Sequence, residues 1–166
     1  LDADLQRAGR HPRLGTASLH ASTIEGGREW STYPERALLR YERRTLPQEG
    51  PGAPLAEARG VLDAAQRLDP ELKAEVRLVF ARGAHEIDER AEIVQALAAS
   101  CGAVGRPAVF AGISFWTDAQ ITANAGIPSV IFGPGGAGLH SSEEYVRVDE
   151  VLACRDVLVD LARRFC

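Results

Sequence analysis

The alternation of helical and extended patterns in residues 84–166 sets the tightest limit on the fold of this chain. Residues 127–133 are almost wholly apolar, which is the composition of a strand buried on both faces. A second apolar strand is predicted over 106–116, and amphipathic helices are predicted over 86–102 and 148–166. Strands that alternate with helices favour a parallel sheet, so this half of the chain is predicted to be α/β.

Residues 1–83 follow a different pattern, and the change near Gly83 is the predicted domain boundary. The pattern predicts the end of a helix, two antiparallel strands, a second helix and a third strand, over residues 1–9, 16–27, 29–47, 54–70 and 71–82. This order is close to a split βαβ arrangement, an open-faced α+β sandwich of the ferredoxin-like kind that lacks its first strand.

Composition excludes several classes of function. The 166 residues carry a net charge of −4, so the chain lacks the basic surface that attracts nucleic acids. No apolar run is long enough to cross a membrane, and the N-terminus has no secretory signal. Three scattered cysteines, at positions 101, 154 and 166, suit a reducing cytoplasm better than a disulfide framework. Because the chain has no methionine and opens inside a helical pattern, we expect an upstream segment.

The apolar segment 127–133 runs into a glycine-rich stretch, and His140 stands at its end. Ligands of α/β sheets gather beyond the carboxyl ends of the strands, where a neutral imidazole can bind a metal. Glycines there let the backbone approach a substrate and offer N–H groups to a developing oxyanion. From the residues alone an exposed loop explains His140 equally well, since one histidine is not a metal site. A phosphate-binding loop is a weaker alternative, because no Gly-Lys-Ser/Thr follows the glycines.

Two further motifs could take part in chemistry. Thr117 and Asp118 precede a short helical pattern, so from the residues alone an N-cap is favoured over a functional role. Arg43 and Arg44 are adjacent on a predicted strand and therefore point to opposite faces, so one of them could grip a carboxylate. The sequence contains no complete catalytic set.

Two stretches together resemble a known family. Residues 25–49 combine a Gly-Gly turn, a short polar segment that ends in proline and a strand that ends in Glu-Arg-Arg. Residues 116–146 combine Thr-Asp-Ala, Gly-Ile-Pro, Phe-Gly-Pro-Gly and a histidine followed by two acids. In this order the motifs resemble the zinc-dependent aminoacylase, acetylornithine deacetylase, succinyl-diaminopimelate desuccinylase and glutamate carboxypeptidase family of metallopeptidases.

The resemblance implies roles for individual residues. His140 matches the last metal-ligand histidine of a site that holds two zinc ions, with cobalt or manganese as alternatives. Arg44 matches an arginine of the family's lid domain that holds the substrate carboxylate. The other matched residues are expected to line or support the substrate site: Ser31 (where many members have asparagine), Gly135 and Gly136 line it, and Thr117 and Asp118 lie near it.

The resemblance also implies an architecture and an activity. Residues 84–166 would be the C-terminal segment of a metallopeptidase catalytic α/β domain, and residues 1–83 an incomplete lid and dimerisation domain. The expected function is hydrolysis of the amide bond of N-acyl amino acids or small peptides, in the manner of acetylornithine deacetylase, by a homodimer. The family's other metal ligands and its general-base glutamate have no match here, so this chain alone is expected to be inactive. The alternative is a non-catalytic truncated module that dimerises through the lid.

Overall fold

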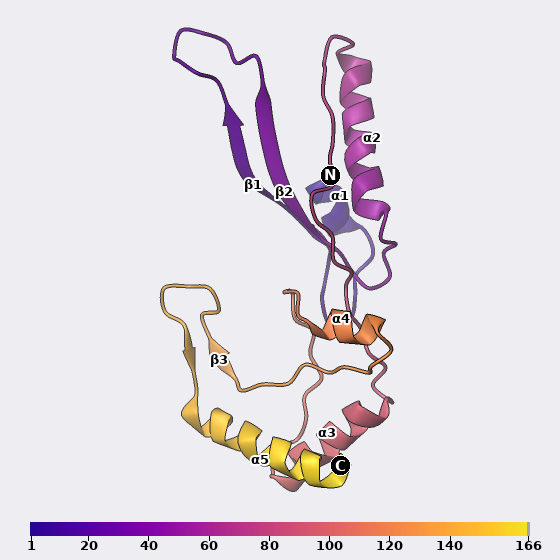
Figure 1. Cartoon of the computed structure of the whole chain (residues 1–166), viewed down its shortest axis with the longest axis vertical. Helices are drawn as coiled ribbons and strands as arrows, with labels where there is room; N and C mark the ends of the chain where they lie inside the picture. The colour runs from indigo at the N-terminus through magenta and orange to yellow at the C-terminus, as the bar shows by residue number, and fades with distance from the viewer. Residues whose placement is uncertain (166) are drawn as a thin grey trace. The chain divides into compact units, whose positions relative to one another are not determined.

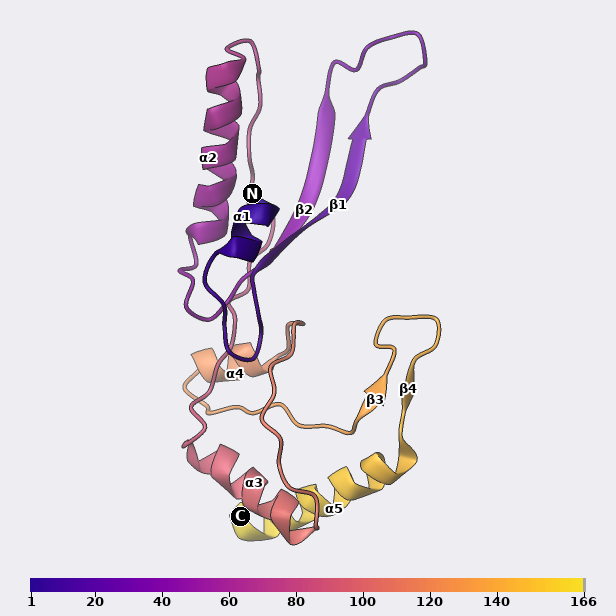
Figure 2. The ribbon, with the colours of Figure 1, turned by 180° about the vertical axis from the view of Figure 1, so that it is seen from behind.

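The computed structural model describes residues 1–165, and these form two compact units. The first unit comprises residues 1–84 together with 112–116, and the second comprises residues 85–111 and the chain from 117 onward. Figure 1 shows the elements of both units, and Figure 2 shows the same ribbon from behind. Within the described residues no helix is long and apolar enough to cross a membrane. The assignment of the two halves as lid and catalytic segment stays a prediction.

The first unit is built around an antiparallel hairpin. Helix α1 (Asp2–Arg7) contacts strand β1 (Ser18–Gly26), which pairs with β2 (Ala37–Arg44), and helix α2 (Ala53–Leu68) follows. The register runs from Ser18 opposite Arg44 to Gly26 opposite Ala37. Pro54 stands in the first turn of α2, where its missing N–H leaves no helical bond unmade. The predictions of both helices and of the two antiparallel strands are confirmed.

A small apolar core lies where α1, β1 and the end of β2 meet. Leu5 of α1 packs with Ala17 and Leu46, and each of the three is about 5% exposed. Leu14 and Leu19 cover this cluster from the side. Leu46 is the second residue after β2, so this core fixes the end of the strand, where Arg44 lies.

The predicted third strand over 71–82 is wrong. The segment has no strand hydrogen bonds, and its apolar side chains are exposed, Leu78 by 56% and Phe80 by 67%. In a split βαβ unit the two strands that flank the helix are not neighbours, because another strand lies between them. The described residues supply no strand for that place, so the alternating pattern of 71–82 has nothing to pair with.

The second unit contains the helix pair α3 (Glu92–Ala103) and α5 (Val148–Phe165), which pack together. Their contact buries Leu97 and Cys101 of α3 against Val157 of α5. The shorter elements of the unit are helix α4 (Ala119–Asn124) and strands β3 (Gly136–Ala137) and β4 (Tyr145–Val146). The three predicted helices of this half are confirmed. Cys166, the predicted last residue of the final helix, lies outside the described residues.

The two predicted parallel strands are also wrong as strands. Residues 106–116 and 127–133 have no ladder hydrogen bonds, and Val109 is 88% exposed. A parallel strand gains stability only from a neighbouring strand and from helices on its faces. Within the described residues no strand lies beside either segment. The fold class is nevertheless α/β, with helices and two small antiparallel sheets.

Candidate functional site

The glycine-rich stretch forms a closed hairpin with His140 in its turn. Strand β3 pairs antiparallel with β4, Gly136 opposite Val146 and Ala137 opposite Tyr145. The Ser141 N–H donates to the Gly138 carbonyl at 2.8 Å and closes a turn of four residues. The sequence indicated a loop here, whereas the structure gives that loop a paired base.

His140 has an unusual backbone conformation. Its φ of +62° makes it the one non-glycine residue with positive φ among the described residues. Left-handed backbone is uncommon for a residue with a Cβ and costs about 1 kcal/mol or more. The side chain is exposed, and within residues 1–165 neither ring nitrogen has a hydrogen bond. The hairpin therefore holds an accessible imidazole in a conformation that the backbone does not favour.

The glycines of this hairpin are required by close approach to the opposite strand. A methyl group on Gly136 would lie 2.1 Å from the Tyr145 carbonyl oxygen, and one on Gly138 would lie 1.9 Å from that of Glu143. Both distances are far inside van der Waals contact. Hairpin closure therefore accounts for Gly136, and its role in lining a substrate site stays a prediction, as does that of Gly135.

The described residues fit one ligand of a metal ion and not a complete metal site. No group of three His, Cys, Asp or Glu side chains that could hold an ion is found within residues 1–165. Burial raises the pKa of the Cys101 and Cys154 thiols, so neither is an activated thiolate, and neither belongs to a group of side chains that could hold an ion. In this part of the chain His140 is thus the one predicted donor.

Arg44 ends β2 and is held on one side. Its Nη1 donates to the Ser114 carbonyl, and its Nε lies 2.7 Å from Glu42 Oε1. The side chain remains 37% exposed, so the rest of the guanidinium can meet a ligand. The segment 112–116 belongs to the same compact unit because it lies against this strand end and against Leu14.

Ser31 and Arg44 lie at opposite ends of the β1–β2 hairpin. Ser31 is exposed in the connection that follows Gly26, whereas Arg44 pairs with Ser18 at the other end. The eight residues of β2, which are seven extended steps, separate the two ends by roughly 23 Å. The hairpin of one chain therefore does not bring these two predicted substrate residues onto one small molecule.

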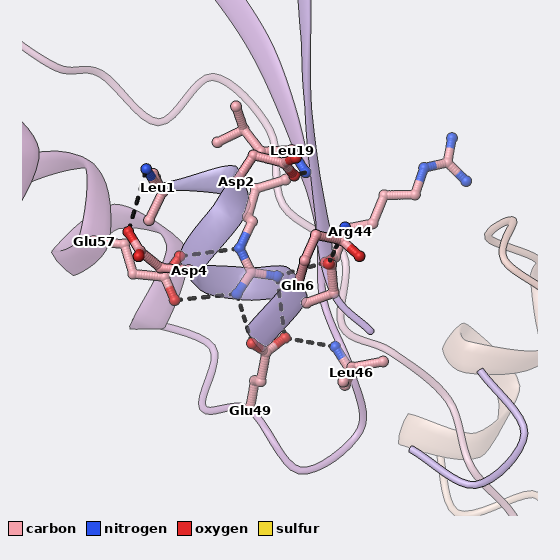
Figure 3. A network of polar contacts seen from close by, with 11 residues as sticks. Leu1, Asp2, Asp4, Gln6, Leu19, Arg44, Leu46, Glu49 and Glu57 are labelled. Atoms are coloured by element: carbon pink, nitrogen blue, oxygen red, sulfur yellow. Dashed lines mark hydrogen bonds and ion pairs between the residues drawn. The ribbon is translucent and has the colours of Figure 1, made fainter. Parts of the chain in front are cut away.

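Arg43, the neighbour of Arg44, has a structural role that the sequence did not distinguish. Its side chain is 3% exposed. Its guanidinium grips two carboxylates, with Nη2 2.5 Å from Glu49 Oε1 and Nε 2.9 Å from Glu57 Oε2. Glu49 also accepts the Leu46 N–H at 2.6 Å. Figure 3 shows this network, in which Glu49 comes from the loop after β2 and Glu57 from α2. The strand and the helix are thus joined by a buried fork of charge-assisted bonds.

Thr117 and Asp118 begin α4 through their backbone. The Asp118 carbonyl accepts the Ile121 N–H at 2.9 Å, and the Asp118 side chain makes no capping hydrogen bond. The Thr117 carbonyl accepts the Gln120 N–H at 3.3 Å. Within residues 1–165 no hydrogen bond or ion pair joins either residue to the His140 hairpin, so their supporting role stays a prediction.

His85 is a residue to which the sequence assigned no role. Its Nε2 lies 2.8 Å from the Ser129 carbonyl oxygen, and the ring is partly buried. The contact anchors the apolar segment 127–133, which leads into the His140 hairpin. A lone histidine in a predicted loop gave no signal of this, because its partner is a backbone atom 44 positions away.

Comparison with known proteins gives three similarities. The model of peptidase family M20/M25/M40 matches residues 7–164. The acetylornithine deacetylase of Myxococcus xanthus is 26% identical over 150 residues, which are 90% of this chain and 38% of that protein. The crystal structure of aminopeptidase PepT from Bacillus cereus superposes with a TM-score of 0.70 at 17% identity, over 96% of this chain and 43% of that chain. The chain thus spans less than half the length of either relative, and the likeness to PepT concerns the fold alone.

Proposed function

The chain belongs to peptidase family M20/M25/M40, and on that premise we propose that it is part of a metal-dependent hydrolase of amide bonds. The substrates we propose are N-acyl amino acids or small peptides. The likeness to an acetylornithine deacetylase over 90% of the chain supports the deacylase end of this range. The activity belongs to the longer protein, since the chain spans 38% of that relative.

The observation on which the proposal depends is the conformation of His140. A hairpin that needs two glycines to close holds this exposed imidazole at a φ of +62°. Backbone strain of this kind persists only where the surroundings enforce it, and it is concentrated at functional sites. We assign His140 one role, donation of a ring-nitrogen lone pair to the metal, for which zinc is the proposed ion.

Arg44 is the proposed anchor for the substrate carboxylate. Its Nη1 donates to the Ser114 carbonyl and Glu42 lies beside Nε, which leaves Nη2 of the partly exposed guanidinium for a ligand. An arginine fixed in this way can orient a carboxylate without first losing side-chain freedom. In the proposal Gly135 and Gly136 line the substrate site, and Thr117 and Asp118 support it. Ser31 lies at the other end of the hairpin from Arg44, so in the proposed homodimer it would line the substrate site of the partner chain.

The proposal includes a homodimer formed through the first unit. Large apolar side chains of α2 and of the segment after it are exposed there, namely Val61, Leu68, Leu78 and Phe80. Exposed apolar surface of this kind is typical of a surface that another chain covers.

Zinc binding and hydrolysis by the complete encoded protein test the proposal. We expect His140→Ala to lower the affinity for zinc at least 100-fold and to abolish hydrolysis of acetylornithine and related N-acyl amino acids. His20→Ala is the matched control, because His20 is an exposed histidine of β1 with no proposed role. Zinc affinity and hydrolysis that survive His140→Ala would overturn the proposal. A wild-type protein that dimerises but neither binds zinc nor hydrolyses any substrate would support the non-catalytic alternative.

A further inference from the structure

Arg147 breaks two local rules at the start of α5. Its carbonyl accepts the Val151 N–H at 3.1 Å, so Arg147 is the residue that caps this 18-residue helix. N-cap positions favour Ser, Thr, Asp or Asn, whose side chains accept a hydrogen bond from the first turn. A helix N-terminus also has a partial positive charge and disfavours a cation. An arginine here needs a reason other than helix formation.

The contacts of Arg147 point to the base of the His140 hairpin. Its backbone N–H donates to the Gly135 carbonyl at 3.1 Å, next to the paired residues Gly136 and Val146. Its guanidinium lies over Gly135, since a methyl group on that glycine would come 2.7 Å from Nη2. Gly135 therefore lacks a side chain in the place that Arg147 occupies.

An ion-pair chain ties this guanidinium to the helix pair. Arg147 Nη2 lies 2.8 Å from Glu150 Oε1, and Glu150 lies 3.6 Å from Arg106 Nη1. Arg106 follows α3, and its Nη2 lies 3.3 Å from Asp149 Oδ2. The base of the hairpin is thus connected to the end of α3 and to the start of α5.

Stability does not explain this arrangement. Arg147 is 53% exposed and Arg106 52%, and ion pairs between exposed side chains contribute about 0–1 kcal/mol. What the contacts fix is geometry, because they hold one strand of a short hairpin at a defined place beside a rigid helix pair.

We propose that Arg147 is a positioning residue for His140. Its guanidinium, held by Glu150 and seated over Gly135, sets the base of the hairpin and so limits where the imidazole can stand. The inference rests on the proposed function, because it treats His140 as a metal ligand. Residues that orient a metal ligand typically change metal affinity 10–100-fold when they are replaced.

The experiment measures zinc affinity and the stability of the metal-free form in the complete protein. Zinc affinity is obtained by competition with a chromophoric chelator for Arg147→Gln, Arg147→Lys and a matched control, Arg155→Gln. Arg155 is also an exposed arginine of the α5 region in an ion pair, with Asp156 at 2.7 Å, and does not contact the hairpin. We expect a 10–100-fold weaker affinity for Arg147→Gln, partial recovery for Arg147→Lys and no change for Arg155→Gln. The metal-free melting temperatures should agree among all three variants.

Two results would overturn the inference. One is a zinc affinity of Arg147→Gln equal to that of Arg155→Gln. The other is a loss of affinity matched by an equal fall in metal-free stability that Arg147→Lys does not recover, which would mark a merely structural role. His140→Ala separates this inference from the proposed function. If His140→Ala loses zinc while Arg147→Gln does not, the positioning role alone fails, and if His140→Ala keeps zinc, the proposed function fails.

Discussion

At the scale of single residues, Gly136 sets how closely the two strands of the His140 hairpin approach. A methyl group at this position would lie 2.1 Å from the Tyr145 carbonyl oxygen, so Gly136→Ala must push β3 away from β4. We expect faster amide hydrogen exchange across residues 135–147 and unchanged protection of α3 and α5. Gly102→Ala in α3 is the control, because nothing lies within 4 Å of its added methyl group. That variant should be as stable as the wild type or up to about 1 kcal/mol more stable. Equal exchange in both variants would contradict the close approach.

Arg43 is the residue whose loss should most weaken the first unit. Arg43→Gln would leave Glu49 and Glu57 without the cation that both of them contact. Because removal of one partner leaves a largely buried charge unpaired, we expect the free energy of unfolding, measured in urea, to fall by about 3 kcal/mol. Arg40→Gln is the matched control on the same strand, since its ion pair with Glu25 is more than half exposed and should contribute less than about 1 kcal/mol. Similar urea midpoints for the two variants would show that the fork contributes no more than a surface pair.

The adjacent arginines also show where prediction from sequence stops at this scale. Strand alternation correctly indicates that Arg43 and Arg44 face opposite sides. It does not say which side is buried, because that depends on Glu49 and Glu57, which reach Arg43 from the following loop and helix. The motif resemblance assigns substrate binding to Arg44, and the side chain of Arg44 is partly exposed, as that role requires. His140 was found from the sequence, but its left-handed backbone was not, since histidine marks such a position less strongly than glycine does.

At the scale of elements, the join between β2 and α2 should be sensitive to acid through Glu49. Burial by itself would raise the pKa of the Glu49 carboxyl, but hydrogen bonds from Arg43 and the Leu46 N–H outweigh it, and the pKa lies below the ordinary value of 4.5. A carboxyl with a lowered pKa in the folded state adds stability above its unfolded pKa and loses it as the pH falls through the folded value. We expect the wild type to exceed Glu49→Gln in unfolding free energy most at pH 7, and the difference to shrink below about pH 4.5. Urea titrations from pH 7 to pH 3 measure it, and a difference that does not vary with pH would contradict the assigned cause.

Helices and the first hairpin could be predicted from sequence because their signals are local. Each of these signals is contained within a few residues of the sequence. They are the helical spacing of apolar residues in α2, the proline in its first turn and the Gly-Gly turn at the end of β1. The segments 71–82, 106–116 and 127–133 have the composition of strands and are not strands in this structure. A strand requires a partner, and periodicity does not reveal whether the partner is present. The β3–β4 hairpin was missed for the opposite reason, because two pairs of residues are too short to leave a pattern.

At the scale of the whole molecule, each compact unit has a small core of its own. The first is centred on Leu5, Ala17 and Leu46, and the second on Leu97, Cys101 and Val157. Many large apolar side chains stay exposed outside these cores, among them Trp30, Tyr33, Val79 and Val109. A chain with so much uncovered apolar surface is expected to meet further protein surface, since monomers seldom expose large apolar patches. This agrees with a chain that spans less than half the length of the relatives it matches.

The same reasoning predicts how this chain behaves without further protein. Within residues 1–165 His140 is the one proposed donor and no ligand set is found, so the chain should bind zinc weakly, because a single ring nitrogen cannot replace the hydration of the ion. Equilibrium dialysis against zinc measures this, with His140→Ala as the reference for adventitious binding. We expect the wild-type chain and His140→Ala to differ little in zinc affinity and neither to hydrolyse acetylornithine. The complete protein, in contrast, should bind zinc tightly and hydrolyse acetylornithine. Tight stoichiometric zinc binding by this chain, lost in His140→Ala, would instead mean that residues 1–166 assemble a metal site among themselves. Hydrolysis by the chain alone would mean that they also supply the base that the reaction requires.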